Sequence, residues 1–186
     1  MNKIIAKLLR RENKPAPRGR TGGDMEKSQF GGGVITANTE LVARHLRKDA
    51  SGKYKEIDRR TVKDKCITDD FAEDIVDNLI AEVAAFGDYK YHDSGTGVIA
   101  EAATDAALGT PCGEARTIGT QIEGTTKQYK SVATHTYAGT FAITEHGLFN
   151  AAAAGILMDR TVFAAINVVA TDKIEFTFTI TFNSGG

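Results

Sequence analysis

The sequence predicts a mainly β protein: an antiparallel, jelly-roll-like β-sandwich with one amphipathic helix and a long, extended, basic N-terminal arm. Three observations predict this fold. From residue 88 onward, apolar and polar residues alternate with the period of two that is typical of half-buried strands. Residues 68–87 have helical spacing instead. Finally, residues 1–65 carry 17 Lys and Arg against 8 Asp and Glu, whereas residues 66–186 carry 6 against 16.

The basic third, residues 1–65, is expected to be an arm or linker with short elements, joined to a helix and β-sandwich domain at 66–186. Residues 14–23 and 31–33 are rich in Pro and Gly, which disfavour helices and strand pairing. Further along, residues 34–37 are expected to form a short edge strand. Residues 39–46 are expected to form a short helix with Leu41, Val42, His45 and Leu46 on one face.

The arm opens with aliphatic pairs surrounded by basic residues, at helical spacing. This pattern fits an anionic membrane surface or a groove on a partner protein, and a frayed, solvated terminus is the other interpretation. The favoured hypothesis is protein binding. The residues assigned to partner contacts are Ile4, Ile5, Leu8, Leu9, Arg10, Arg11, Arg18, Arg20 and Phe30.

The helix is predicted to begin at Thr68 or Asp69, each a good N-cap, and its first turns are acidic, as the helix dipole favours. Gly87 ends it. Its apolar stripe is expected to pack on the sheet that follows. That stripe consists of Phe71, Ile75, Val76, Leu79, Ile80, Val83 and Phe86.

The strongest strand signal is residues 173–183, where five apolar side chains, all Ile or Phe, alternate with Glu and Thr. This face, Phe176–Phe182 in particular, is expected to build the core. The Ala-rich residues 100–108 and 150–157 are expected to form short helical or irregular crossovers. Weaker strands are predicted at residues 88–92, 115–122, 128–137, 139–145 and 161–169.

Motifs that carry chemistry are weak, so the chain is predicted not to be an enzyme, with no catalytic, cofactor or metal residues. Residues 95–100 match a dinucleotide fingerprint only loosely and are interpreted as a turn. His92, His135 and His146 lack metal-ligand spacing and are interpreted as satisfied surface or turn histidines. Cys66 and Cys112 are either a disulfide or two unrelated thiols, and unrelated thiols are favoured.

Four segments carry a resemblance to a known class of proteins. They are residues 90–97 (KYHDSGTG), 143–150 (ITEHGLFN), 157–163 (LMDRTVF) and the Phe/Thr strand near the C-terminus. Together they resemble β-sandwich modules of tail-fibre and collar-like proteins, and small structural proteins, of tailed bacteriophages. The resemblance covers roughly residues 88–186, and its residues are structural in kind.

The resemblance implies a structural protein of the virion, assembled in the host cytoplasm. The leading hypothesis is a capsid decoration or cement protein whose arm staples neighbouring subunits. Its expected partners are the major capsid protein or other virion proteins, and it is expected to form a homo-oligomer, either a dimer or a trimer. The alternative is a trimeric tail-fibre, collar or head–tail adaptor module. A nucleic-acid binder with a basic arm is a weaker alternative, and no membrane partner is expected.

Overall fold

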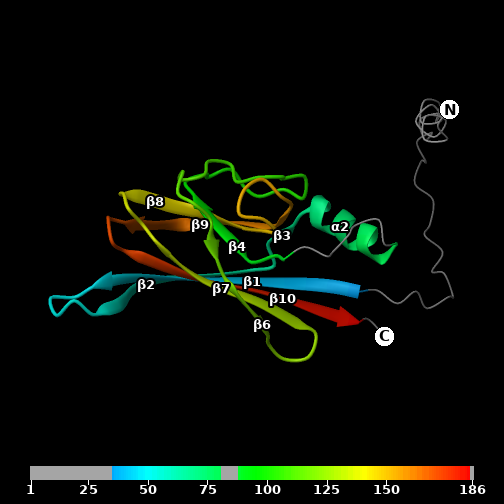
Figure 1. Ribbon diagram of the computed structural model, residues 1–186, viewed down its shortest axis with the longest axis horizontal. Helices are drawn as coiled ribbons and strands as arrows, with labels where there is room; N and C mark the ends of the chain where they lie inside the picture. Colours follow the sequence, from blue (N-terminus) through cyan, green and yellow to red (C-terminus); the bar gives the residue numbers. More distant parts are fainter. Residues whose placement is uncertain (1–34, 81–87, 185–186) are drawn as a thin grey trace, which may run out of the picture. The chain divides into compact units, whose positions relative to one another are not determined.

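The computed structural model describes residues 35–80 and 88–184. These residues form ten strands in two antiparallel five-stranded sheets, which stack face to face (Figure 1). The first sheet, sheet A, has the order β2 (Tyr54–Lys63), β1 (Ile35–Lys48), β10 (Lys173–Ser184), β7 (Gln128–Thr136) and β6 (Thr120–Glu123). Sheet B has the order β3 (Cys66–Ile67), β9 (Leu157–Val168), β8 (Phe141–Phe149), β4 (Tyr91–Gly95) and β5 (Thr117–Ile118). The predicted antiparallel sandwich is confirmed.

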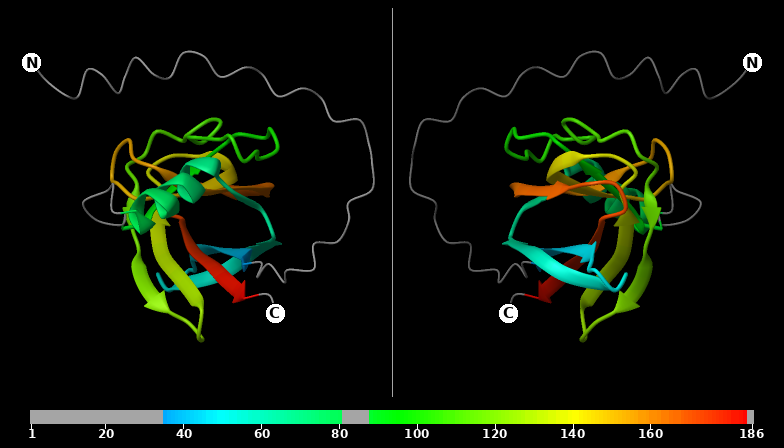
Figure 2. Two further views of the ribbon diagram at one scale, coloured as in Figure 1. Left: turned by 90° about the vertical axis from the view of Figure 1, so that its right-hand side faces the viewer. Right: turned by 90° about the vertical axis from the view of Figure 1, so that its left-hand side faces the viewer.

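The core lies between the two sheets, as the end-on views of Figure 2 show. The inward residues of β10 alternate as predicted: Ile174, Phe176, Phe178 and Ile180 are fully buried. Facing them from sheet B are apolar residues of β8 and β9, including Ile143 and Ile166. Alternation on the central strand therefore places one apolar row against sheet B and leaves the Glu and Thr row on the outer face of sheet A.

The helix expected at residues 39–46 is wrong, because these residues belong to β1. Leu41, Ala43 and His45 are buried on the inward face of β1, at a period of two. The strand pairs on one side with β10, where Leu41 faces Phe178, and on the other with β2. Residues 35–37 are thus the start of an interior strand and not an edge strand.

The sandwich consequently begins at residue 35, and not at residue 66. Residues 35–63, expected to be part of the arm, supply β1 and β2. The strands expected at residues 88–92, 115–122 and 139–145 are shifted or divided, whereas the strand at residues 128–137 matches β7. The crossovers at residues 100–108 and 150–157 are largely irregular.

The predicted helix is present as α2 (Asp69–Leu79), capped by Thr68, whose side chain accepts a hydrogen bond from the Phe71 backbone N–H. Phe71 is buried and Ile75 is half-buried. Val76, Leu79 and Ile80, however, are 51%, 81% and 58% exposed. Of the stripe residues that the structure describes, only Phe71 and Ile75 therefore pack on the sandwich. The stripe positions Val83 and Phe86 and the end at Gly87 lie outside the described residues.

The long connection between β4 and β5 covers the outer face of sheet B (Figure 1). Fully buried Glu145, on β8, holds this connection by accepting hydrogen bonds from the backbone N–H groups of Gly97 (3.0 Å), Gly109 (3.0 Å) and Thr110 (2.7 Å). Arg160, on β9, donates to the same carboxylate at 2.8 Å. One buried carboxylate thus satisfies three loop donors and one guanidinium.

Candidate interaction site

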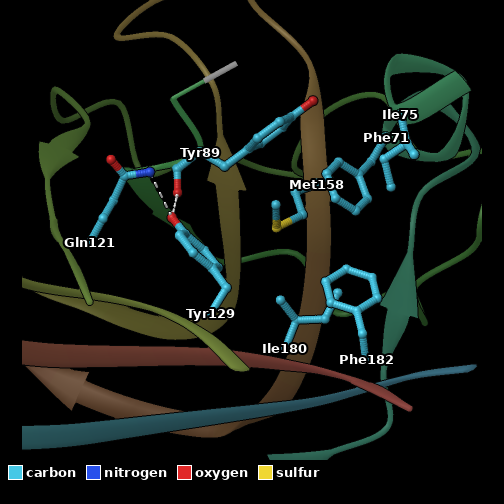
Figure 3. Close-up of a pocket in the computed structure, with 8 residues that line it drawn as sticks. All are labelled: Phe71, Ile75, Tyr89, Gln121, Tyr129, Met158, Ile180 and Phe182. Carbon is cyan, nitrogen blue, oxygen red and sulfur yellow. Dashed lines mark hydrogen bonds between the residues drawn. The ribbon is translucent and has the colours of Figure 1, made fainter. Parts of the chain in front are cut away.

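An apolar cavity of about 470 Å³ lies at one end of the sandwich, between the two sheets and beside α2 (Figure 3). We call it the end pocket. Residues from both sheets, from α2 and from the segment before β4 converge on it. Its lining consists of Phe71, Ile75, Tyr89, Gln121, Tyr129, Met158, Ile180 and Phe182. A cavity of this size and composition is suited to apolar side chains or a small apolar ligand.

The two tyrosine hydroxyls of the end pocket already have hydrogen-bond partners. The Tyr129 hydroxyl donates to the backbone carbonyl of Tyr89 and accepts from the Gln121 amide at 3.2 Å, as the dashed lines of Figure 3 show. The Tyr89 hydroxyl donates to Asp74 on α2 at 2.6 Å. Burial and the Asp74 carboxylate raise the pKa of Tyr89. The described lining of the pocket therefore presents mainly carbon to an occupant.

The α2 surface that points away from the end pocket is acidic. Its eleven residues include five carboxylates and no basic residue. Asp70, Glu73 and Asp77 are spaced by three and four positions, which places them on one face of the helix. Asp70 and Glu73 are exposed and Asp77 is half-buried. We call these three residues the acidic face of α2, which can attract a basic partner.

A second hollow of about 360 Å³ shares Gln121, Tyr129 and Phe182 with the end pocket. It extends the apolar surface over β6, where Ile122 is 45% exposed. Lys127 and Glu123 also line it. The pocket, this hollow and the exposed aliphatic residues of α2 make this end of the sandwich the candidate interaction site.

The nine arm residues assigned to partner binding lie outside the described residues: Ile4, Ile5, Leu8, Leu9, Arg10, Arg11, Arg18, Arg20 and Phe30. The structure nonetheless shows where the chain leaves the sandwich. β1 begins at Ile35, which pairs with Ser184, and Ala37 pairs with the pocket residue Phe182. The N-terminal end of β1 is therefore at the same end of the sandwich as the pocket.

The sequence predicts only some of the residues that line the pocket. The alternation of β10 marked Ile180 and Phe182 as core, and the helical stripe marked Phe71 and Ile75. Nothing in the sequence indicated that Tyr89, Gln121 and Tyr129 would meet them. These three residues come together through the pairing of β6 with β7 and the packing of two sheets.

The histidines are buried, so the prediction of surface or turn histidines is wrong. His92 Nδ1 lies 2.9 Å from His146 Nε2, and His92 Nε2 lies 2.7 Å from Ser131 Oγ, all inside the core. Burial lowers the pKa of His92 to about 3 and, together with the neighbouring His92, lowers that of His146. His135 contacts Glu114 at 2.8 Å. The His92–His146 pair is enclosed and the His135–Glu114 pair nearly so, which favours a structural role.

Asp159, also in the core, gives a pH-dependent prediction. Its carboxylate accepts a hydrogen bond from Thr161 at 2.8 Å, while Oδ2 has no protein partner. Burial raises its pKa from 3.8 to about 7. Because the folded state holds this proton more tightly than the unfolded state, the ionised carboxylate destabilises the fold progressively as the pH rises from about 4 to about 7.

We therefore expect Asp159→Asn to gain stability relative to the wild type as the pH rises, by about 2 kcal/mol more at pH 8 than at pH 5. The stability lost on acidification through His92 and His146 is common to both proteins and cancels in the comparison. Urea unfolding of both chains at the two pH values measures the difference. An equal effect of the substitution at both pH values contradicts the assignment.

Three further observations concern metal binding, the two cysteines and membrane-spanning helices. Among the described residues, no cluster of three or more His, Cys, Asp or Glu side chains has the geometry to hold a metal ion. Cys66 and Cys112 are free thiols, and burial raises the pKa of Cys66. Within the described ranges, no helix has the length and apolarity required to cross a membrane.

The basic residues at positions 55–65 are each paired with a carboxylate. Lys55 pairs with Asp49, Arg59 with Glu56, Arg60 with Asp58, Lys63 with Glu40 and Lys65 with Glu101. Because these positive charges are locally neutralised, the surface that they form attracts nucleic acid less strongly.

Comparison with known proteins does not assign this chain to a family. No family model, no curated protein and no solved structure matches this chain.

Proposed function

We propose that the chain is a non-enzymatic structural protein of a tailed-bacteriophage virion, which docks on the capsid and reinforces it as a decoration or cement protein. In this function, the sandwich contacts the shell and the arm staples neighbouring subunits. The partners are the major capsid protein or other virion proteins. The proposal rests first on the candidate interaction site, an apolar pocket beside an acidic helix at the end where the arm joins the sandwich.

The residues with potential chemical function support a structural assignment. Glu145 and Arg160 hold a loop, the His92–His146 pair is fully enclosed, and Asp172 pairs with His45 and Arg47. Apart from His146 Nδ1, which has no hydrogen-bond partner, these polar groups are paired within the protein. The end pocket, the hollow over β6 and the exposed aliphatic residues of α2 are apolar, as in surfaces that bind protein. The sequence resemblance to virion β-sandwich modules points the same way.

A trimeric tail-fibre, collar or head–tail adaptor module is the second candidate. It is favoured by β5 and β6, short strands at the edges of their sheets that expose Ile118 (65%) and Ile122. Exposed apolar residues on sheet edges are suited to contacts between subunits. The arm is dispensable for this second function.

Immunogold electron microscopy of particles from a lysate that contains the chain at its natural level tests both candidates. We expect label distributed over the heads, with many copies per particle. Label confined to the tail or the neck favours the second candidate. Purified particles that lack the chain, checked by mass spectrometry, contradict both.

A further inference from the structure

We infer that the end pocket receives the N-terminal segment of a second copy of this chain. That segment, residues 3–11, has the sequence KIIAKLLRR. This inference deepens the proposed function by identifying what the staple binds. It rests on the complementarity between an apolar pocket lined in part by an acidic helix and a segment that is both apolar and basic.

The first part of the match is between the apolar lining of the cavity and the aliphatic side chains of the segment. The end pocket has about 470 Å³ of space lined almost wholly by carbon, with its two tyrosine hydroxyls paired internally. The segment offers two aliphatic pairs, Ile4–Ile5 and Leu8–Leu9, spaced so that one helical face carries members of both. Burying such side chains in an apolar cavity is the main favourable contribution to binding.

The second part of the match is between the basic charge of the segment and the acidic charge of α2. The segment carries Lys3, Lys7, Arg10 and Arg11 and no acidic residue. Phe71 and Ile75 of α2 line the cavity, and the acidic face of the same helix points away from it, so the pocket mouth lies in the negative field of α2. Docking of the aliphatic pairs brings the long basic side chains into this negative field. This arrangement selects a basic apolar segment over a neutral or acidic one.

The length of the chain allows the segment to reach a neighbour. Arg11 is separated from Ile35, the first described residue, by 24 peptide steps, which span up to about 80 Å when extended. The starting point lies at the pocket end of each sandwich, because β1 begins beside the C-terminal end of β10. Copies that meet at this end can therefore exchange their N-terminal segments.

Carbodiimide cross-linking of the full-length wild-type chain tests the inference. This reagent joins an amine to a carboxylate only when the two are in contact. We expect cross-links from Lys3 or Lys7 to Asp70, Glu73 or Asp77. Mixing ¹⁴N-labelled and ¹⁵N-labelled chains before reaction identifies the joined peptides by mass, and we expect mixed-isotope products. Products of a single isotope only contradict exchange between copies.

Two matched pairs of chains test the role of the apolar contacts. Leu8→Ser with Leu9→Ser keeps every charge, and we expect it to reduce the cross-link yield about tenfold or more relative to wild type. Ile75→Ser, in the pocket, is expected to reduce it, whereas Ala72→Ser, exposed on the same helix and outside the pocket lining, is not. Yields unchanged by both Leu8→Ser/Leu9→Ser and Ile75→Ser mean that charge alone brings the groups together, which overturns the inference.

The outcome separates this inference from the function on which it rests. If the chain is present on phage heads but the mixed-isotope cross-links are absent, the staple binds elsewhere and the decoration function stands. If the chain is absent from virions but the cross-links form, the pocket mediates self-association of a protein with another function.

Discussion

Deletion of residues 1–33 is expected to abolish stable attachment of the chain to capsids while leaving the sandwich folded. The first strand begins at Ile35, and its pairing with β10 and β2 is retained in full by the shortened chain. The core residues are likewise retained. The deleted part carries the residues assigned to partner binding, together with eight Lys and Arg against three Asp and Glu.

Co-sedimentation with capsids measures attachment, and thermal unfolding followed by circular dichroism provides the control for folding. We expect the melting temperature to change by only a few degrees, since every described strand and core residue is retained. A shortened chain that co-sediments as fully as the complete chain contradicts the staple. A shortened chain that fails to fold shows that the arm is part of the folding unit.

Glu145→Ala is expected to be the most destabilising single substitution, at about 3–5 kcal/mol. Burial raises the pKa of Glu145, but hydrogen bonds from the Thr110 backbone N–H and from Arg160 outweigh this effect and lower it overall. The carboxylate is therefore ionised and fully engaged at neutral pH. Its removal leaves three loop N–H groups and the Arg160 guanidinium, which is nearly buried, without this acceptor.

Glu175→Ala provides the matched control, because Glu175 also pairs with an arginine, Arg44, at 2.6 Å. Both side chains of this pair are about one-third exposed, so the pair contributes less than about 1 kcal/mol. Urea unfolding of the two variants measures the contrast. Equal losses of stability for Glu145→Ala and Glu175→Ala contradict the structural role assigned to the buried carboxylate.

The sequence predicted the sandwich well where apolar residues are large and alternate strictly. On β10, every second residue from Ile174 to Phe182 is Ile or Phe, and this row is buried or half-buried in the core. β1 was missed because its inward row includes Ala43 and His45, which are weak apolar markers. His45 is buried only because Asp172, 127 positions away, accepts its hydrogen bond at 2.8 Å. A contact so distant in sequence cannot be inferred from local periodicity.

The candidate interaction site was likewise only partly predictable from the sequence. The apolar stripe of α2 predicted that the helix packs on the sheet, and Phe71 and Ile75 do so. The exposure of Leu79 could not be predicted, because it depends on where the edge of the sandwich lies relative to the helix. Charged residues such as Glu145 and Arg160 are usually solvated, so their burial under a loop also has no local signal.

Limited trypsin digestion of the full-length chain, free in dilute solution and bound to capsids, tests the central claim most directly. The basic residues at positions 3–20 provide cleavage sites in the segment assigned to stapling. The docking function predicts rapid release of these peptides from the free chain and strong protection on capsids, with the sandwich from residue 35 onward resistant in both. Equal cleavage rates in the free and the bound chain would contradict a staple formed on assembly.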